Sequence, residues 1–361
     1  MYPYFLIYSL VGFFTLLEFY KFNFFINYKN FFKFTLFSIL LIFMGFKYYV
    51  GGDWGTYSNY FYEVIHEGIN YRDLNNDIGY YLINLFLYKL GFNFFAINIF
   101  AALISLYGIH LLAKRSSNYF LFFLILTPYF IFIILMGYTR QSISIGLFLI
   151  SISLLYKKYN LINLLFFSIL IFVAFLFHKS SIILLIIPLF NIKINFLSFS
   201  ILNNIIFLLI SIFIFIIFND RLIHRLEYFF DNNYSSLGGY LRSSIMLSFS
   251  IIYLVFFKLF KEKEDNKINL IILIVIIIIS SFMIILPSSV IIDRFLLYFY
   301  FIIPIFFIQI INHSKNDFIK SIILYSILVL GYLLMFLWFN FAVNSKSWVP
   351  YQSYISYYNA K

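Results

Sequence analysis

The sequence predicts an all-α, polytopic integral membrane protein, and three observations support this prediction. Of its 361 residues, 63% are hydrophobic and only 11% are charged, whereas soluble domains have about half and about 25%. The mean hydropathy is +0.96. The apolar residues also fall in blocks close to the ~20 residues with which a helix crosses a hydrocarbon core. A soluble enzyme is excluded because the chain has too few polar groups to cover its surface, and a disordered chain is excluded because it has too much apolar surface.

Eleven apolar blocks are expected to form transmembrane helices, because a backbone in lipid must satisfy its hydrogen bonds internally. They are residues 4–20, 34–50, 94–112, 119–136, 142–156, 161–177, 197–218, 241–260, 268–286, 295–311 and 319–339. Two shorter segments, 78–90 and 180–190, are further candidates, and 180–190 is either a short span or a re-entrant piece. We therefore expect about 11–12 transmembrane helices in one domain over residues 1–361, with its longest outer loops at 51–77 and 219–240.

The lysines predict the orientation of these helices. They gather in every second loop, and the positive-inside rule assigns those loops to the cytoplasm. The lysine-bearing positions are 21–33, 114, 157–158, 193, 258–267 and 315–320. The alternation is consistent if 180–190 crosses the membrane, which places both termini outside. If that segment is re-entrant, the downstream half inverts and the lysine bias contradicts it, so we favour a crossing.

The arginines are distributed differently from the lysines. Six of the seven fall on the lysine-poor side, where most of the carboxylates also lie: Arg72, Arg140, Arg221, Arg225, Arg242 and Arg294. A guanidinium is planar and binds phosphate through two parallel hydrogen bonds. Several arginines at the outer interface therefore favour a site for a lipid-linked pyrophosphate. The alternative is that each one reaches the head groups or pairs with a nearby acid. That alternative is favoured for Arg221 and Arg225, and a local ion pair is slightly favoured for Asp293–Arg294.

Two segments on the same side contain candidate bases. His178 ends an apolar run, and its imidazole titrates near neutrality, where it can accept a proton from a sugar hydroxyl. The neighbouring Lys179 favours the neutral form. Asp53 lies in a glycine-rich loop with Trp54 and Tyr57, whose flat rings suit sugars. The alternatives are an interfacial histidine and an ordinary belt of interfacial aromatic residues.

Several kinds of site are missing from the sequence. It has no Cys, which excludes disulfides, Fe–S clusters and thiolate zinc sites. It also has no Gly-x-Gly-x-x-Gly, no P-loop, no Asp-x-Asp pair and no histidines at metal-ligand spacing. A transferred sugar is therefore expected to come from a lipid-linked donor rather than a nucleotide, without a metal or other cofactor. The net charge of +11 is scattered between apolar blocks, which argues against nucleic-acid binding.

Five short motifs stand near the ends of the predicted spans. They are Gly52-Asp53-x-x-x-Tyr57, Asp77-Ile78-Gly79-Tyr80, Arg140-Gln141-Ser142, His178-Lys179-Ser180 and Asp293-Arg294. In this order they resemble the EpsG family of Wzy-like bacterial polysaccharide polymerases, over residues 34–301. Each motif is short, and their order and placement are more specific than any one of them. The doubled glycine before Asp53 and the following Trp54 depart from the family pattern.

The resemblance implies a GT-C-like glycosyltransferase of the bacterial inner membrane, with its active site on the periplasmic or outer face. Such a polymerase transfers a growing O-antigen, capsule or exopolysaccharide glycan from undecaprenyl pyrophosphate to a new undecaprenyl-linked repeat unit. The implied partners are the bilayer, the undecaprenyl-pyrophosphate-linked oligosaccharide and, optionally, a chain-length regulator. No cofactor and no nucleic acid are implied.

Residue roles follow from this hypothesis. Arg140, Arg242 and Arg294 are predicted to bind pyrophosphate, with Arg140 also acting in catalysis. Either His178 or Asp53 is the base. The remaining predicted substrate contacts are Trp54, Tyr57, Gln141, Lys179 and Asp293.

Two other classes of protein remain open. A flippase or transporter of lipid-linked oligosaccharide needs ionisable residues at mid-membrane depth, and this chain gathers them at one face. A ligase or an acyltransferase of surface glycans shares the arginine and histidine chemistry. Ligases, however, carry one large periplasmic loop, and an acyltransferase with a cytosolic donor needs its histidine on the lysine-rich side.

Overall fold

The fold is described by a computed structural model for residues 1–67, 77–189, 237–260, 265–284 and 289–355. Each predicted span within these ranges is mainly helical, which confirms an all-helical, polytopic membrane protein, although the helix in span 34–50 ends at Gly45. Among the described residues, five helices are long and apolar enough to cross a membrane, and the bent pair Ser289–Phe299 and Ile302–His313 adds a sixth if it is one span. The predicted span 197–218, Arg72, Arg221 and Arg225 lie outside the described residues.

The chain divides into two compact units. Unit 1 comprises Met1–Ile150, Leu176–His178 and Phe301–Lys361, and unit 2 comprises Ser151–Phe175 and Lys179–Tyr300. The elements of unit 1 are α1 (Tyr2–Phe19), α2 (Asn23–Asn27), α3 (Lys29–Gly45), β1 (Lys47–Tyr48), α4 (Trp54–Glu67), α6 (Ile78–Lys89), α7 (Phe95–Arg115), α8 (Tyr119–Leu126), the π-helix η1 (Thr127–Leu135), the first part of α9 (Thr139–Lys157), α16 (Ile302–His313), α17 (Asp317–Phe341), the 3-10 helix η6 (Val343–Ser347) and β2 (Gln352–Ser353).

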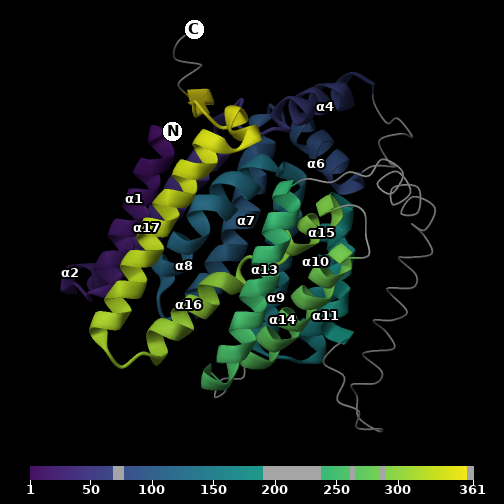
Figure 1. Cartoon of the computed structure of the whole chain (residues 1–361). Coiled ribbons are helices and arrows are strands. Elements are labelled where there is room, and N and C mark those ends of the chain that lie inside the picture. The colour runs from purple at the N-terminus through teal and green to yellow at the C-terminus, as the bar shows by residue number, and fades with distance from the viewer. Residues whose placement is uncertain (68–76, 190–236, 261–264, 285–288, 356–361) are drawn as a thin grey trace. The chain divides into compact units, whose positions relative to one another are not determined.

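Helix α1 defines two ends of unit 1. Near its start, the Tyr4 hydroxyl donates to the carbonyl of Trp348 over 3.0 Å. Near its other end, Glu18 accepts from the amide of Phe120 over 2.8 Å and pairs with Lys29 over 2.7 Å. An 18-residue helix is about 27 Å long. We call these the Trp348 end and the lysine end; the start of α1 and the end of α17 lie together at the former (Figure 1).

Two glycines bring α7 and α9 into close contact within unit 1. A Cβ on Gly108 would lie 2.7 Å from the carbonyl oxygen of Gly146, and a Cβ on Gly146 would lie 2.7 Å from the backbone of Ile104 and Ser105. Small residues at a helix crossing in a membrane let the backbones approach closely. The crossing fixes α9, the helix that begins just before Arg140, against α7.

Unit 2 contains the rest of the helices. They are the end of α9, most of α10 (Leu161–Phe177), the 3-10 helix η2 (Lys179–Leu185), α11 (Ile186–Leu189), α13 (Leu237–Phe256), η3 (Phe257–Phe260), α14 (Asp265–Ser281), η4 (Phe282–Ile284), α15 (Ser289–Leu296) and η5 (Leu297–Phe299). Inside the unit, the Tyr156 hydroxyl donates to Asn269, whose amide contacts the Tyr253 hydroxyl. These buried polar groups tie α9, α13 and α14 together.

Two expectations need comment. The predicted span 295–311 is wrong as a single helix: α15 already begins at Ser289, and a separate helix, α16, begins at Ile302. For the expected segment 180–190, the described residues form a seven-residue 3-10 helix (Lys179–Leu185) followed by a four-residue α-helix (Ile186–Leu189). Together these reach about 20 Å, less than the ~30 Å of a hydrocarbon core. Whether this segment crosses the membrane stays a prediction.

Candidate functional site

The centre of the candidate site is an ion pair in unit 1. Nη1 of Arg140 donates to Oδ2 of Asp77 over 2.7 Å. Arg140 is the second residue of α9, and Asp77 immediately precedes α6, where its carboxylate makes no capping bond to its own helix. The side chain of Asp77 is only 5% exposed. The carboxylate is therefore used to orient the guanidinium rather than to cap α6.

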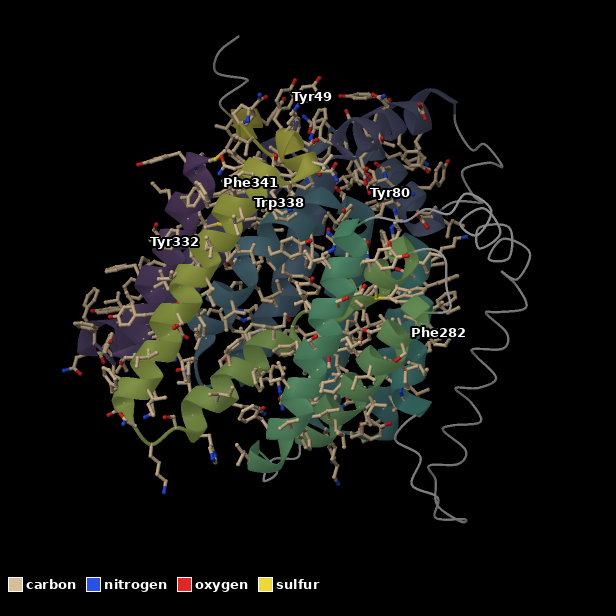
Figure 2. The ribbon with its side chains drawn as sticks, in the orientation of Figure 1. Tyr49, Tyr80, Phe282, Tyr332, Trp338 and Phe341 are labelled. Atoms are coloured by element: carbon tan, nitrogen blue, oxygen red, sulfur yellow. The ribbon has the colours of Figure 1, made fainter. Side chains whose placement is uncertain are left out.

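Tyrosine rings surround this guanidinium. Its Cζ lies 5.3 Å from the ring centroid of Tyr57 on α4 and 5.9 Å from that of Tyr80 on α6. The two rings are 5.6 Å apart, and Tyr60 stacks on the other side of Tyr80. An aromatic face attracts a cation through its quadrupole. Figure 2 shows Tyr80 and Tyr49 towards the same end of unit 1 as Trp338. Arg140 is thus fixed by one acid and two rings.

Arg140 keeps hydrogen-bonding capacity for a ligand. A guanidinium has five N–H donors, and the side chain remains 34% exposed. Its buried Nε makes no hydrogen bond to any residue that the structure describes. Arg140 also stands at the N-terminus of α9, where the helix dipole adds positive potential. The arrangement therefore suits a polyanion such as pyrophosphate.

The glycine-rich loop lies before α4. Asp53 is half-buried and its carbonyl accepts from the amide of Tyr57 over 3.0 Å. Trp54 is buried, with its ring 4.3 Å from that of Tyr49 and 5.5 Å from that of Phe94. Tyr49 is 60% exposed. Tyr49 is therefore the exposed ring of this cluster, and the buried ring of Trp54 packs against it.

The backbone just before His178 packs on α6, the helix that begins directly after Asp77. A Cβ on Gly79 would lie 3.0 Å from the backbone of Leu176. Gly79 is two residues after Asp77, and Leu176 is two residues before His178, so each separation is at most about 7 Å. His178 is half-buried. Gln141 is buried within α9 at 3% exposure.

Unit 2 contains a second arginine–aspartate pair. Nε of Arg242 donates to Oδ1 of Asp293 over 2.7 Å, and Nη2 donates to Oδ2 over 2.6 Å. The sequence favoured a local pair between Asp293 and the adjacent Arg294, but both carboxylate oxygens accept from Arg242, which lies 51 residues away. Arg294 is exposed and Lys179 is half-buried. Arg242 thus uses two of its three guanidinium nitrogens within the protein.

A sequence model of the EpsG family matches residues 30–353. The chain belongs to the EpsG family. That family is linked to exopolysaccharide biosynthesis, so this is a multi-pass membrane protein with a role in making polysaccharide. No curated protein and no solved structure matches the chain. The matched range includes every site residue described above.

Sequence reasoning missed three residues in or near the candidate site. Asp77 and Tyr80 stood in a quoted motif without an assigned role. Lys47 was placed inside the predicted span 34–50. Its position on the lysine-poor side of the membrane was a signal that could have drawn attention to it. Lys47 is 4% exposed, and its Nζ donates to the carbonyl of Met136. Burial lowers the pKa of Lys47 to about 7, and the nearby Asp53 opposes this shift.

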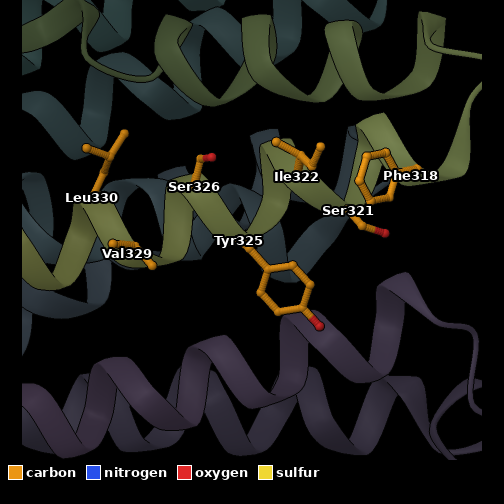
Figure 3. Close-up of a pocket in the computed structure, with 7 residues that line it drawn as sticks. All are labelled: Phe318, Ser321, Ile322, Tyr325, Ser326, Val329 and Leu330. Carbon is orange, nitrogen blue, oxygen red and sulfur yellow. The ribbon is translucent and has the colours of Figure 1, made fainter.

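A groove on α17 of this EpsG-family protein has a different character. It measures about 610 Å³ and is lined by Phe318, Ser321, Ile322, Tyr325, Ser326, Val329 and Leu330 (Figure 3). The Tyr325 hydroxyl contacts that of Tyr20, near the lysine end. No cation or carboxylate lines the groove. Within the described ranges, no three histidine or acidic side chains group as metal ligands. The Arg140 cluster therefore remains the site with usable chemistry.

Proposed function

We propose that this EpsG-family protein is a polysaccharide polymerase, a glycosyltransferase that uses a lipid-linked donor. It moves a growing glycan from undecaprenyl pyrophosphate onto the non-reducing sugar of a new undecaprenyl-linked repeat unit. One observation carries the proposal: Arg140 is fixed by Asp77 between two tyrosines, yet it is still 34% exposed. Family membership supplies the biosynthetic context.

The chemical step needs a base and a group that stabilises the leaving pyrophosphate. An acceptor hydroxyl attacks the anomeric carbon of the donor and forms the new C–O bond with an oxygen electron pair. The bond from that carbon to the phosphate oxygen breaks, and its electrons leave with undecaprenyl pyrophosphate. The hydroxyl proton passes to the base. Negative charge thus develops on the leaving group, where the Arg140 donors are effective because Asp77 already orients them before the reaction.

The base is either His178 or Asp53. His178 lies close in chain to Leu176, which packs on Gly79 beside the Arg140–Asp77 pair. Asp53 precedes α4, the helix that carries Tyr57. A histidine base gives a rate that rises with pH through the histidine pKa range, whereas an aspartate base is already ionised at neutral pH. The pH profiles of His178→Gln and Asp53→Asn variants therefore distinguish the two.

The other predicted residues receive supporting roles. Arg294 is exposed and is proposed as a second pyrophosphate contact, while Arg242 is proposed mainly to hold Asp293. Tyr57, with Trp54 behind the exposed Tyr49, is proposed to line the sugar groove. Gln141 and Lys179 are proposed to contact the substrate. The Trp348 end is proposed to face the outside of the bacterial inner membrane, because most of the loop lysines of unit 1 lie at the other end.

A deletion and complementation experiment tests the function. The gene is deleted in its host and the surface polysaccharide is separated on a gel. A single-repeat product identifies a polymerase, internal accumulation with no surface glycan identifies a flippase, and free lipid-linked polymer identifies a ligase. Complementation with Arg140→Lys should restore little polymer, since lysine lacks the planar guanidinium that binds phosphate through two parallel hydrogen bonds. Arg115→Lys, at the lysine end, should restore normal polymer; full activity of Arg140→Lys would contradict the assigned role.

A further inference from the structure

Three residues connect the π-helix η1 to α9 and so determine where Arg140 is placed. Residues 136–138 follow the end of η1 at Leu135, and α9 starts at Thr139. We call residues 136–138 the Arg140 turn. The amide of Tyr138 bonds to the carbonyl of Ile134 over 3.0 Å, and the amide of Ser142 bonds to the carbonyl of Tyr138 over 2.7 Å. The two helices therefore continue through this turn with little free chain between them.

Lys47 holds the first residue of the Arg140 turn. Its Nζ donates to the carbonyl of Met136, and the contact is fully buried. The last carbonyls of a helix have no partner within the helix and carry partial negative charge. A buried lysine is therefore a strong partner for this helix end. Lys47 itself lies in β1, which pairs with β2 in the register Lys47 to Ser353 and Tyr48 to Gln352.

Trp348 holds the same turn from another direction. Its Nε1 donates to the carbonyl of Phe132 in η1 over 2.9 Å, and the residue is 3% exposed. The ring also lies directly against Gly137, where an added Cβ would stand 2.6 Å from Cζ2 of the indole. Only glycine fits this position while the indole is in place.

The two anchors belong to one assembled structure. The C-terminal segment (residues 343–354) contains η6, Trp348 and β2. The amide of Gly51 bonds to the carbonyl of Ser347 over 2.8 Å, and Gly51 has φ +106°, a left-handed conformation that favours glycine. The Tyr351 ring stacks on Phe43 at 4.2 Å. Lys47, Gly51 and the C-terminal segment thus form one connected structure over the Arg140 turn.

We propose that Lys47 and Trp348 are positioning residues for Arg140. By fixing the carbonyls of Met136 and Phe132, they hold the Arg140 turn and set the direction in which the guanidinium meets the pyrophosphate. This inference rests on the proposed function for the role of Arg140. It adds two residues, one from β1 and one from the C-terminal segment, that touch no substrate and act through α9.

A double-mutant cycle separates positioning from a general effect on stability. The full-length protein is purified, and initial rates are measured with a lipid-linked repeat unit. Lys47→Met removes the ammonium but keeps the length, and Trp348→Phe removes the N–H but keeps a ring. Each should lower kcat about 10- to 100-fold, because small misplacements of catalytic groups are costly. In an Arg140→Lys background each should lower the rate by less than about 3-fold, because residues acting through one another are not additive.

Lys346→Met is the matched control, because Lys346 is exposed on the same C-terminal segment. It should change neither kcat nor KM. Independent, multiplicative effects of Lys47→Met and Arg140→Lys would overturn the positioning role, as would a Trp348→Phe protein with normal kcat. A conservative rescue adds a second check: Lys47→Arg, which keeps a cationic donor, should recover part of the rate lost in Lys47→Met.

A labelling measurement tests the turn without relying on activity. The chain has no Cys, so Tyr138→Cys introduces a unique thiol in the Arg140 turn. Its reaction with a small water-soluble thiol reagent should accelerate several-fold in the Trp348→Phe and Lys47→Met proteins but not in Lys346→Met. Unchanged labelling overturns the inference even if Arg140 is catalytic. Faster labelling together with a fully active Arg140→Lys would instead refute the proposed function while confirming that these residues hold the turn.

Discussion

Arg140 gives a single nitrogen to Asp77, over 2.7 Å and across 63 positions of sequence. Arg242 gives two nitrogens to Asp293, over 2.7 and 2.6 Å. The first arrangement orients a guanidinium that stays partly exposed, whereas the second engages two nitrogens of the guanidinium inside the protein. The same pair of residue types thus fits the proposed ligand-binding role in one case and a structural role in the other.

Lysine substitutions should separate these two roles. Arg242→Lys loses a bidentate contact, so we expect it to lower the free energy of unfolding by about 1.5–3 kcal/mol. Arg140→Lys can keep its single bond to Asp77, so its melting temperature should change little while polymer formation falls. Thermal unfolding of the purified proteins and polysaccharide gels measure the two effects. The reverse pattern, a stable Arg242→Lys protein and an unfolded Arg140→Lys protein, would contradict this interpretation.

The crossing of α7 and α9 should not tolerate a larger residue. In Gly146→Ala the new methyl group would lie 2.7 Å from backbone atoms of Ile104 and Ser105, which cannot rotate away. We expect destabilisation of about 1–3 kcal/mol from overpacking. Gly12→Ala is the matched control, because its methyl would lie 3.5 Å from Leu328, an ordinary contact. Melting temperatures measure both; equal values for the two variants would argue against a tight crossing.

Lys47 should make stability depend on pH. Burial lowers its pKa to about 7 from an ordinary value of 10.5. Between these values the unfolded chain carries a proton that the folded chain lacks, so raising the pH stabilises the fold, by at most about 1.4 kcal/mol per pH unit. The stability of the natural protein relative to Lys47→Met should therefore rise between pH 7 and 10. A flat difference in melting temperature across this range would show that Lys47 stays charged.

Labelling of single introduced cysteines should show that the two ends of unit 1 lie in different compartments. Gly55 lies at the start of α4, where it is exposed and has open space around it. Ser117 is exposed near the lysine end. In intact cells, a membrane-impermeant maleimide should label Gly55→Cys but not Ser117→Cys, because the lysine end is expected in the cytoplasm. Both should react after lysis. Labelling of Ser117→Cys in intact cells would remove the orientation on which the proposed function depends.

The helical blocks could be predicted because each one is a long apolar run, and a lipid environment leaves a helix as the main choice for such a run. The break before Ile302 was missed, because residues 295–311 carry no charge and hydropathy does not mark where one helix stops, although Pro304 is a residue that often begins a helix. Helix α4, at Trp54–Glu67, lies in a segment that the sequence predicted as part of an outer loop.

The site was predicted by residue type rather than by pairing. Arg140 was singled out because a guanidinium on the lysine-poor side suits pyrophosphate, and His178 because an imidazole can accept a proton. The Arg140–Asp77 bond, however, joins residues far apart in sequence. Adjacency favoured Asp293 with Arg294, whereas the structure pairs Asp293 with Arg242. Contacts of this kind depend on helix packing, which a single sequence does not reveal. The roles of Lys47 and Trp348 were missed for the same reason.

The indole of Trp348 donates to the carbonyl of Phe132, which lies 216 positions earlier in the sequence. During synthesis, Phe132 and Gly137 enter the membrane long before that indole leaves the ribosome. The Arg140 turn must therefore wait, incompletely held, until the late residues arrive and close over it. The order of translation thus limits when this protein matures. A nascent chain that stalls before residue 348 would already span the bilayer, but the guanidinium of Arg140 would not yet be held in position.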